Sequence, residues 1–522
     1  MSKLLFKSGD DWTQELLERV WEEIEIIAKE DLRITYYKPQ IEIVSAKQML
    51  DAYTSVGMPT MYKHWSFGKE YVYNEKMYKA GKMGLAYELV INSNPCIAYL
   101  MEENDAMMQT LVLAHASVGH SAVFKHNYLF KDKTDADAII DYLEFARNYI
   151  KLCEEKYGED EVESVLDACH ALQNYGVDKY KKPKPLNAAQ EEKVALQKFE
   201  QELSDYDLVW EKVGKKKVKK EKGPEIDRAL KESQENILYF IEKNAPHLPV
   251  WKRELIRITR MLAQYFSPQR ATKVLNEGFA SFTHYFIMNR LYDKGLIDGG
   301  TMISFFASHS GVLNQPGYGS FNPYTLGFAI FMDIKRICEG GHWAIRNNDK
   351  IWVPITDEDR EYFPQLIGKD WVEAVQYAMM NFKDETFIQQ YLSPKVARDM
   401  QIFVIKDGGI TEESFFVTEI SNQRSFRELR NKMAAQYAVE NIMPDVQVTR
   451  ADNRGSRKIT LKHFVKNNRP LALHDAKQVI QYVADLWEYT VMLETIEHDE
   501  EGNLVPLNLS FFGRYSAEAI RK

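Results

Sequence analysis

Cysteine is scarce in this chain of 522 residues, and its cysteines form no motif. The four are widely spaced, with no Cys-x-x-Cys pair among them: Cys96, Cys153, Cys169 and Cys338. A disulfide framework or a zinc ribbon needs cysteines in closely spaced, recurring groups. The spacing therefore speaks against both, and we expect reduced, mostly buried thiols of the kind that a cytoplasmic protein carries.

Long apolar runs are also missing. No uninterrupted stretch approaches the roughly 20 apolar residues that cross a bilayer, and residues 1–11 lack the apolar core of a signal peptide. The formal net charge is −9, and an acidic chain is a poor general ligand for nucleic acid. We therefore expect a cytoplasmic protein with no membrane span and no nucleic-acid partner.

The chain nevertheless has enough apolar residues for a large hydrophobic core, because hydrophobic residues make up 45% of it. Composition and the spacing of hydrophobic residues divide the sequence into four segments. These are a helical segment at 1–180, a charged linker at 181–230, a second helical segment at 231–393 and an α+β segment at 394–522. The first and third segments are expected to form one body. The expected fold class is thus a mainly α N-terminal body, for which a zincin-like helical core is one option, with a smaller α+β C-terminal domain.

The C-terminal segment alternates apolar and polar residues in the manner of half-buried strands. Five strands are expected, at 401–406, 414–420, 445–449, 458–462 and 490–496. No cluster of catalytic side chains accompanies these strands, which favours a binding or assembly module.

The linker contains a lysine-rich stretch, with seven lysines among residues 212–222. Such a run is typical of an exposed charged helix or linker. We expect it to bury nothing, so that proteases cut there first and folding does not require it. A nucleic-acid role is the alternative, but no aromatic residues are interleaved with the lysines.

Two apolar helices carry the polar residues that are best suited to chemistry. Residues 97–124 are expected to form one long helix that includes His115 and His120. Residues 275–293 are expected to form a second helix, because apolar residues recur there at helical spacing. Its opposite face carries Glu277. Ionisable groups on apolar helices are costly to bury unless they find a partner.

The two histidines of the first helix are five positions apart, which on an ideal α-helix separates them by about 140°. A π-bulge or a local break would bring His115 and His120 onto one face, and such bulges favour functional sites. Zinc hydrolases of the thermolysin type use two histidines and a glutamate as ligands. Residues 276–280 are similar to the Asn-Glu-x-x-Ala segment that supplies the glutamate in that class.

We therefore predict one divalent ion bound by His115, His120 and Glu277, with His284 as a fourth ligand or as a group that orients the ligands. Zinc is the expected ion, although iron and manganese suit the same ligand types. The alternative is that these histidines are hydrogen-bonded core residues that bind no ion.

The general base of such an enzyme is not at its usual place. Ala116 follows the first histidine, where thermolysin-type enzymes carry a glutamate. Glu88 is the replacement that we expect. His309 and Tyr324 belong to stretches rich in glycine, proline and aromatic residues, and we expect them to line the cleft and polarise a substrate carbonyl.

Several long segments resemble the SpoVR family, the stage V sporulation protein R proteins and their YcgB relatives. The matching segments extend over nearly the whole chain: Ala52–Pro59, His64–Lys69, Tyr87–Pro95, Tyr99–Asn104, His115–His120, Asn174–Asp178, Asn276–Ala280 and Asn322–Gly327. The resemblance implies a role in formation of the spore cortex, a peptidoglycan layer, or in the stress response of bacteria that do not sporulate. It also implies a serine kinase of the PrkA type as a partner.

Two functions are consistent with these observations. The first is a zincin-like metal-dependent hydrolase that acts on a peptide or amide. The second is a non-catalytic scaffold that works with the kinase through its C-terminal module. The sequence pattern names no substrate for either.

Overall fold

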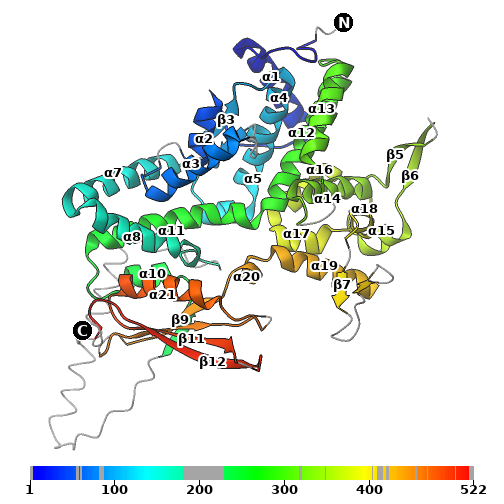
Figure 1. Ribbon diagram of the computed structural model, residues 1–522. Helices are drawn as coiled ribbons and strands as arrows, with labels where there is room; N and C mark the ends of the chain where they lie inside the picture. The colour runs from blue at the N-terminus through cyan, green and yellow to red at the C-terminus, as the bar shows by residue number, and fades with distance from the viewer. Residues whose placement is uncertain are drawn as a thin grey trace, which may run out of the picture. The chain divides into compact units, whose positions relative to one another are not determined.

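The computed structural model describes residues 4–54, 58, 61–80, 88–179, 229–316, 320–346, 349–402, 404–407, 415–418, 423–452, 455–466, 468–499 and 501–516 (Figure 1). Residue contacts divide the chain into two compact units. Unit 1 comprises Met1–Leu166 and Met261–Met443, and unit 2 comprises Asp167–Arg260 and Pro444–Lys522. These units differ from the four expected segments, because residues 394–443 belong to unit 1, whereas residues 167–179 and 231–260 belong to unit 2.

Unit 1 is mainly helical. Its helices are α1 (Gln14–Glu30), α2 (Ala46–Thr54), α3 (Trp65–Lys79), α4 (Ala106–Val112), η1 (Leu113–His120), α5 (Ser121–His126), α6 (Tyr128–Lys133), α7 (Ile139–Tyr157), α12 (Lys273–Asp293), α13 (Gly299–Val312), α14 (Pro323–Cys338), α15 (Asp357–Tyr362), α16 (Trp371–Asn381), α17 (Asp384–Tyr391), α18 (Pro394–Asp399), α19 (Gln423–Tyr437) and α20 (Val439–Ile442). Two further helices, α8 (Glu159–Ala171) and α11 (Val250–Ala271), each begin in one unit and end in the other.

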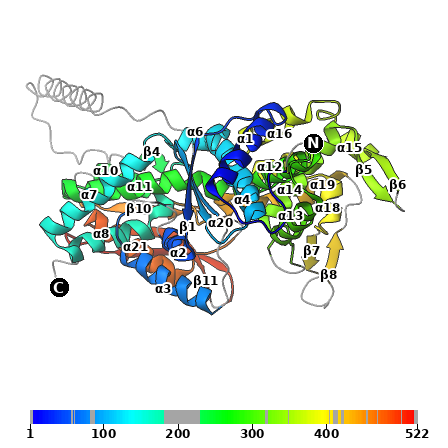
Figure 2. The same cartoon turned by 90° about the horizontal axis from the view of Figure 1, so that it is seen from above.

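Helix α12 lies at the centre of unit 1 and is the predicted helix of residues 275–293. It packs along η1 and α14 and also contacts α13, and both views show α12 beside α13 and α14 (Figure 1 and Figure 2). Its apolar residues Leu275, Phe279 and Phe282 are buried in the main hydrophobic core. The helical spacing that predicted α12 therefore also identified the side chains that this core buries.

Glycines let the backbones of these helices approach closely. A Cβ added at Gly278 would lie 2.3 Å from the Cα of Gly327 in α14, and one at Gly119 would lie 2.6 Å from the Cα of Ala280. Neither separation is possible for a larger residue without movement of the backbone. Both contacts adjoin candidate ligands, because Gly119 precedes His120 and Gly278 follows Glu277.

The first turn of α12 is held by a carboxylate from elsewhere in the chain. Asp384, the first residue of α17, accepts hydrogen bonds from the backbone N–H groups of Val274 (2.9 Å) and Leu275 (2.8 Å). Burial raises the pKa of Asp384 to about 7, against the opposing effect of these N–H groups. Asp384 satisfies donors that the helix itself leaves unpaired and so fixes the start of the helix that carries Glu277.

A three-stranded sheet in unit 1 corrects one prediction. Its strands are β1 (Pro39–Val44), β2 (Glu88–Ile91) and β3 (Cys96–Met101), in the order β1-β3-β2. The prediction that the long helix begins near residue 97 was wrong, because α4 begins only at Ala106. Residues 96–100 are all buried, so this central strand shows no alternation that would distinguish it from a buried helix.

Unit 1 also contains two hairpins. Strands β5 (Gly341–Arg346) and β6 (Asp349–Pro354) form one, and β7 (Val404–Asp407) and β8 (Phe415–Thr418) form the other. The latter pair corresponds to the first two strands predicted for the C-terminal segment. They form a sheet of their own, so the five predicted strands do not share one sheet.

Unit 2 is the smaller α+β part. Its sheet has the order β12-β11-β10-β9-β4, and its described residues also include helices α10 and α21, the short 3₁₀-helix η2 and parts of α8 and α11. The bounds are β4 (Ala229–Gln234), β9 (Val446–Ala451), β10 (Ile459–His463), β11 (Val491–His498), β12 (Leu504–Phe511), α10 (Ile237–Asn244), α21 (Leu473–Trp487) and η2 (Gln173–Tyr175). The last three predicted strands are β9, β10 and β11, whereas β4 and β12 were not predicted.

The lysine-rich stretch 212–222 lies outside the described residues, and its expected protease sensitivity stays a prediction. Among the helices in the described part of the chain, none combines the length and apolar character that crossing a membrane requires.

Candidate metal centre

The two histidines of the first predicted helix lie on a π-helix. Helix η1 runs from Leu113 to His120 between α4 and α5. A π-helix forms hydrogen bonds from i to i+5, so residues five apart stack on one face. The imidazole centroids of His115 and His120 are accordingly 4.6 Å apart. The local departure from α-helical geometry that the spacing required is therefore a complete π-helical segment.

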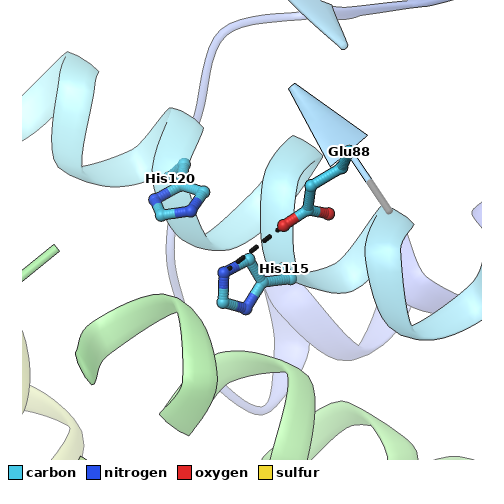
Figure 3. A group of neighbouring side chains, drawn as sticks. All are labelled: Glu88, His115 and His120. Atoms are coloured by element: carbon cyan, nitrogen blue, oxygen red, sulfur yellow. Dashed lines mark ion pairs between the residues drawn. The ribbon is translucent and has the colours of Figure 1, made fainter. Parts of the chain in front are cut away.

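Two carboxylates face these rings from other elements. Glu88, the first residue of β2, places Oε1 3.4 Å from Nε2 of His115, as Figure 3 shows. Glu277 of α12 places Oε2 3.6 Å from Nε2 of His115 and 3.4 Å from Nε2 of His120. Ligand-type atoms of Glu88, His115 and His120 all lie within 4.8 Å of one another.

These separations match the distances between ligands of one ion. Bonds of 2.0–2.1 Å arranged tetrahedrally place neighbouring ligand atoms about 3.3 Å apart. The three nitrogen–oxygen distances of 3.4–3.6 Å lie close to that value. They exceed the 2.7–3.2 Å of ordinary N–H···O hydrogen bonds. The donor set therefore fits a divalent ion better than a set of direct hydrogen bonds.

The cluster is buried and incompletely satisfied. The side chains of His115 and His120 are 5% and 8% exposed, and those of Glu88 and Glu277 are 16% and 19% exposed. One oxygen of each glutamate, Oε2, has no hydrogen-bond partner among the described residues. Buried polar atoms are nearly always paired, so these two oxygens leave the cluster with acceptor capacity that a bound cation would satisfy.

Burial and mutual charge shift the pKa values of the cluster in different directions. Burial raises the pKa of Glu88, and the nearby imidazoles oppose the rise. Burial would also raise the pKa of Glu277, but the His120 and His115 imidazoles outweigh it and lower the pKa. Burial alone would lower the pKa of His120; Glu277, Glu88 and Asn276 instead raise it to about 9. The opposite pKa shifts of Glu277 and His120 reflect the attraction between this carboxylate and this imidazole.

The far nitrogen of each ring is held by another residue. Nδ1 of His120 donates to Oδ1 of Asn276 at 2.9 Å, because a carboxamide oxygen can only accept. Nδ1 of His115 lies 2.8 Å from Nδ1 of His284. Both rings therefore direct Nε2 toward the carboxylates. Of the two roles expected for His284, this geometry favours the one that orients a ligand.

The remaining candidates occupy different places. The Tyr324 ring lies nearly parallel to that of His115, with 6.2 Å between centroids. His309 is 5% exposed, and its Nδ1 lies 2.8 Å from Nε2 of His284. Burial, reinforced by the nearby imidazole of His115, lowers the pKa of His309 to about 4. Tyr324 thus stands beside a candidate ligand, whereas His309 is separated from the cluster by one imidazole.

Two features of the centre were not anticipated from the sequence. Glu88 was expected as a base, but it is as close to His115 as Glu277 is to His120. Asn276 was noted only as a neighbour of Glu277, and its contact with His120 was not foreseen. The sequence signal for the Asn276 contact was its position next to Glu277, since two successive polar residues on an apolar helix each need a partner.

Fold and site together define a mainly helical protein with a buried histidine–carboxylate cluster. A family model described as SpoVR like protein matches residues 11–442, and one described as SpoVR-like C-terminal domain matches residues 444–498. The chain therefore belongs to the SpoVR family. It is 47% identical over 502 residues to the uncharacterized protein YcgB of Escherichia coli (strain K12). The matched residues cover 95% of this chain and 94% of that protein. No solved structure matched the chain.

Proposed function

We propose that the protein is a metal-dependent hydrolase whose divalent ion is held by His115, His120 and Glu277, with Glu88 as the general base. The observation that carries this proposal is the nitrogen–oxygen spacing of 3.4–3.6 Å around the two Nε2 atoms. Two histidines and one carboxylate are the ligand set of catalytic zinc sites that leave one position open. Zinc is the ion that we propose, although iron and manganese accept the same ligand types.

The substrate class that we propose is a peptide or an amide. A divalent ion in this position lowers the pKa of a bound water and polarises a carbonyl. Glu88 would take a proton from the attacking water while the water oxygen bonds to the carbonyl carbon. Glu88 would then return that proton to the leaving nitrogen as the C–N bond breaks. The Tyr324 hydroxyl is our candidate to hydrogen-bond the carbonyl oxygen.

From the family we also infer a role in spore cortex formation or in the stress response, together with a PrkA-type serine kinase. The cortex is a peptidoglycan layer, so an amide hydrolase would be chemically suited to it. A scaffold that catalyses nothing is the other candidate. It predicts that the histidines serve only the fold, and the following experiment separates the two.

The test is metal analysis of purified protein by mass spectrometry. Wild-type protein should carry about one equivalent of a divalent ion, and Glu277→Gln should lose most of it, because the amide keeps the size but not the charge of the ligand. Glu88→Gln is the matched variant within the cluster and should retain the ion. Glu339→Gln, at the exposed residue that follows α14, controls for expression and handling.

A wild-type protein that is expressed with metals available and still carries no stoichiometric ion would contradict the metal site and leave the scaffold function standing. Loss of the ion from Glu88→Gln, with retention in Glu277→Gln, would reverse the roles of the two glutamates.

A further inference from the structure

Three buried imidazoles form a continuous hydrogen-bonded chain that leads away from the candidate centre. Nδ1 of His115 lies 2.8 Å from Nδ1 of His284, and Nε2 of His284 lies 2.8 Å from Nδ1 of His309. The three residues are 4%, 1% and 5% exposed. They come from η1, α12 and α13, so the chain joins three helices of unit 1.

The outer end of this row of imidazoles is the ring of His309. Nε2 of His309 has no hydrogen-bond partner among the described residues. Its ring packs against Phe305, Phe328 and Tyr285, with centroids 5.4, 5.0 and 5.2 Å away. The outer end of the chain is therefore enclosed by aromatic rings.

A row of neutral imidazoles joined in this way has only two proton arrangements, because each ring carries one N–H and each hydrogen bond needs one donor. In the inward arrangement His309 donates to His284, His284 donates to His115, and Nε2–H of His115 faces the carboxylates. In the outward arrangement His115 donates to His284 and His284 donates to His309. Nε2 of His115 then carries a bare lone pair.

We propose that His284 and His309 are positioning residues whose outward arrangement holds the proton of His115 on Nδ1 and so prepares His115 as a ligand. This inference rests on the proposed function, because a metal ion needs the lone pair of Nε2. A single residue has the same effect on His120, since the Asn276 oxygen accepts from Nδ1 of that ring and keeps its proton there. Groups that hydrogen-bond the far side of a ligand imidazole fix its tautomer and orientation.

Conversion between the two arrangements conserves protons. One proton leaves Nε2 of His115, one moves from Nδ1 of His284 to Nδ1 of His115, and one moves from Nδ1 of His309 to Nε2 of His284. One proton is then taken up at Nε2 of His309 from water. The charge of the three rings is unchanged.

The test is a titration with Co²⁺ alone, followed by its visible absorption, on wild-type protein and two variants of His284. His284→Leu removes the acceptor and should weaken Co²⁺ binding about 10–100-fold. His284→Gln supplies an oxygen that can accept from Nδ1 of His115 and should restore most of the affinity and the wild-type spectrum. His309→Leu leaves His284 free to adopt either tautomer and should give an intermediate loss.

Thr283→Val is the matched control, because it removes a buried hydroxyl from the same helix without touching the histidines. Melting without metal shows whether each variant is folded. Equal affinity in wild type and His284→Leu, or a loss in His284→Gln as large as in His284→Leu, would overturn the positioning role while the proposed function stands. If wild-type protein binds no Co²⁺, both fail together.

Discussion

His120 illustrates how single residues prepare this centre. Its ring lies between Glu277 on one side and Asn276 on the other, two successive residues of α12. One residue faces the nitrogen that would bind the ion, and the other fixes the proton on the opposite nitrogen. Since tautomer and orientation are set before any ion arrives, the Asn276 contact should contribute to affinity although it is no ligand.

We therefore expect Asn276→Leu to weaken metal binding about 10–100-fold, because the variant keeps the branched shape of the side chain and loses its acceptor oxygen. Metal affinity is measured by competition with a chelator of known affinity. Asn289→Leu is the matched control on the same helix, where the amide donates to the Tyr285 carbonyl oxygen and contacts no candidate ligand in the described part of the chain. Asn276→Leu protein that binds metal as tightly as wild type would show that His120 needs no such partner.

At the scale of elements, the centre depends on a π-helix held among α-helices. A π-helix is rare and occurs mostly as a short bulge inside an α-helix. Here η1 is packed along α12, and Gly119 lets the two backbones touch. The contact between Gly278 and Gly327 locks α12 against α14 in the same way. Close packing of three helices thus fixes where His115, His120 and Glu277 meet.

Gly278→Ala should therefore destabilise the protein by about 1–3 kcal/mol, the usual cost of forcing a methyl group into a closely packed core. The added Cβ would meet the Gly327 backbone at 2.3 Å, which no rotation of a side chain can relieve. Urea unfolding followed by circular dichroism measures the loss, and metal binding should fall with it because Glu277 is the adjacent residue.

Gly311→Ala is the control for this substitution. Gly311 is also helical, but nothing lies within 4 Å of a Cβ added there. Alanine is the better helix former, so this variant should be unchanged or stabilised by up to about 1 kcal/mol. A Gly278→Ala protein as stable as Gly311→Ala would mean that the close approach of α12 and α14 does not limit stability.

At the scale of the whole molecule, all the candidate ligands belong to unit 1, although they come from distant parts of the chain. Glu88, His115 and His120 precede the segment of unit 2 that begins at Asp167, and Glu277 follows its end at Arg260. An ion that joins these residues would link the two halves of unit 1 in the sequence. It would contribute nothing directly to the strands of unit 2.

Metal binding should accordingly protect unit 1 selectively. At an ion concentration 100 times the dissociation constant, binding stabilises the folded state by about 2.7 kcal/mol. Hydrogen exchange followed by mass spectrometry should therefore slow by up to about 100-fold in peptides from η1 and α12 when metal is added. Exchange in β9 to β12 should not change. Equal protection of both units, or protection of unit 2 alone, would contradict an ion site made from these residues.

Several features of this protein follow from its sequence by local rules. The apolar spacing of residues 275–293 predicts α12, since helical periodicity is a property of neighbouring positions. The interval between His115 and His120 indicates that an ordinary α-helix cannot present both rings on one face, and the structure contains a π-helix there. The alternation at 445–449, 458–462 and 490–496 predicts three strands of the sheet in unit 2.

Tertiary structure decided the rest, because those features depend on which distant segments pack together. Strand β3 resembles a buried helix in sequence, and only its pairing with β1 and β2 makes it a strand. The chain of His115, His284 and His309 exists because η1, α12 and α13 converge, which no local period encodes. Glu88 joins the centre through the position of β2. The residue types that suit a metal ion are thus legible in the sequence, whereas their convergence is set by backbone contacts such as that of Gly278 with Gly327.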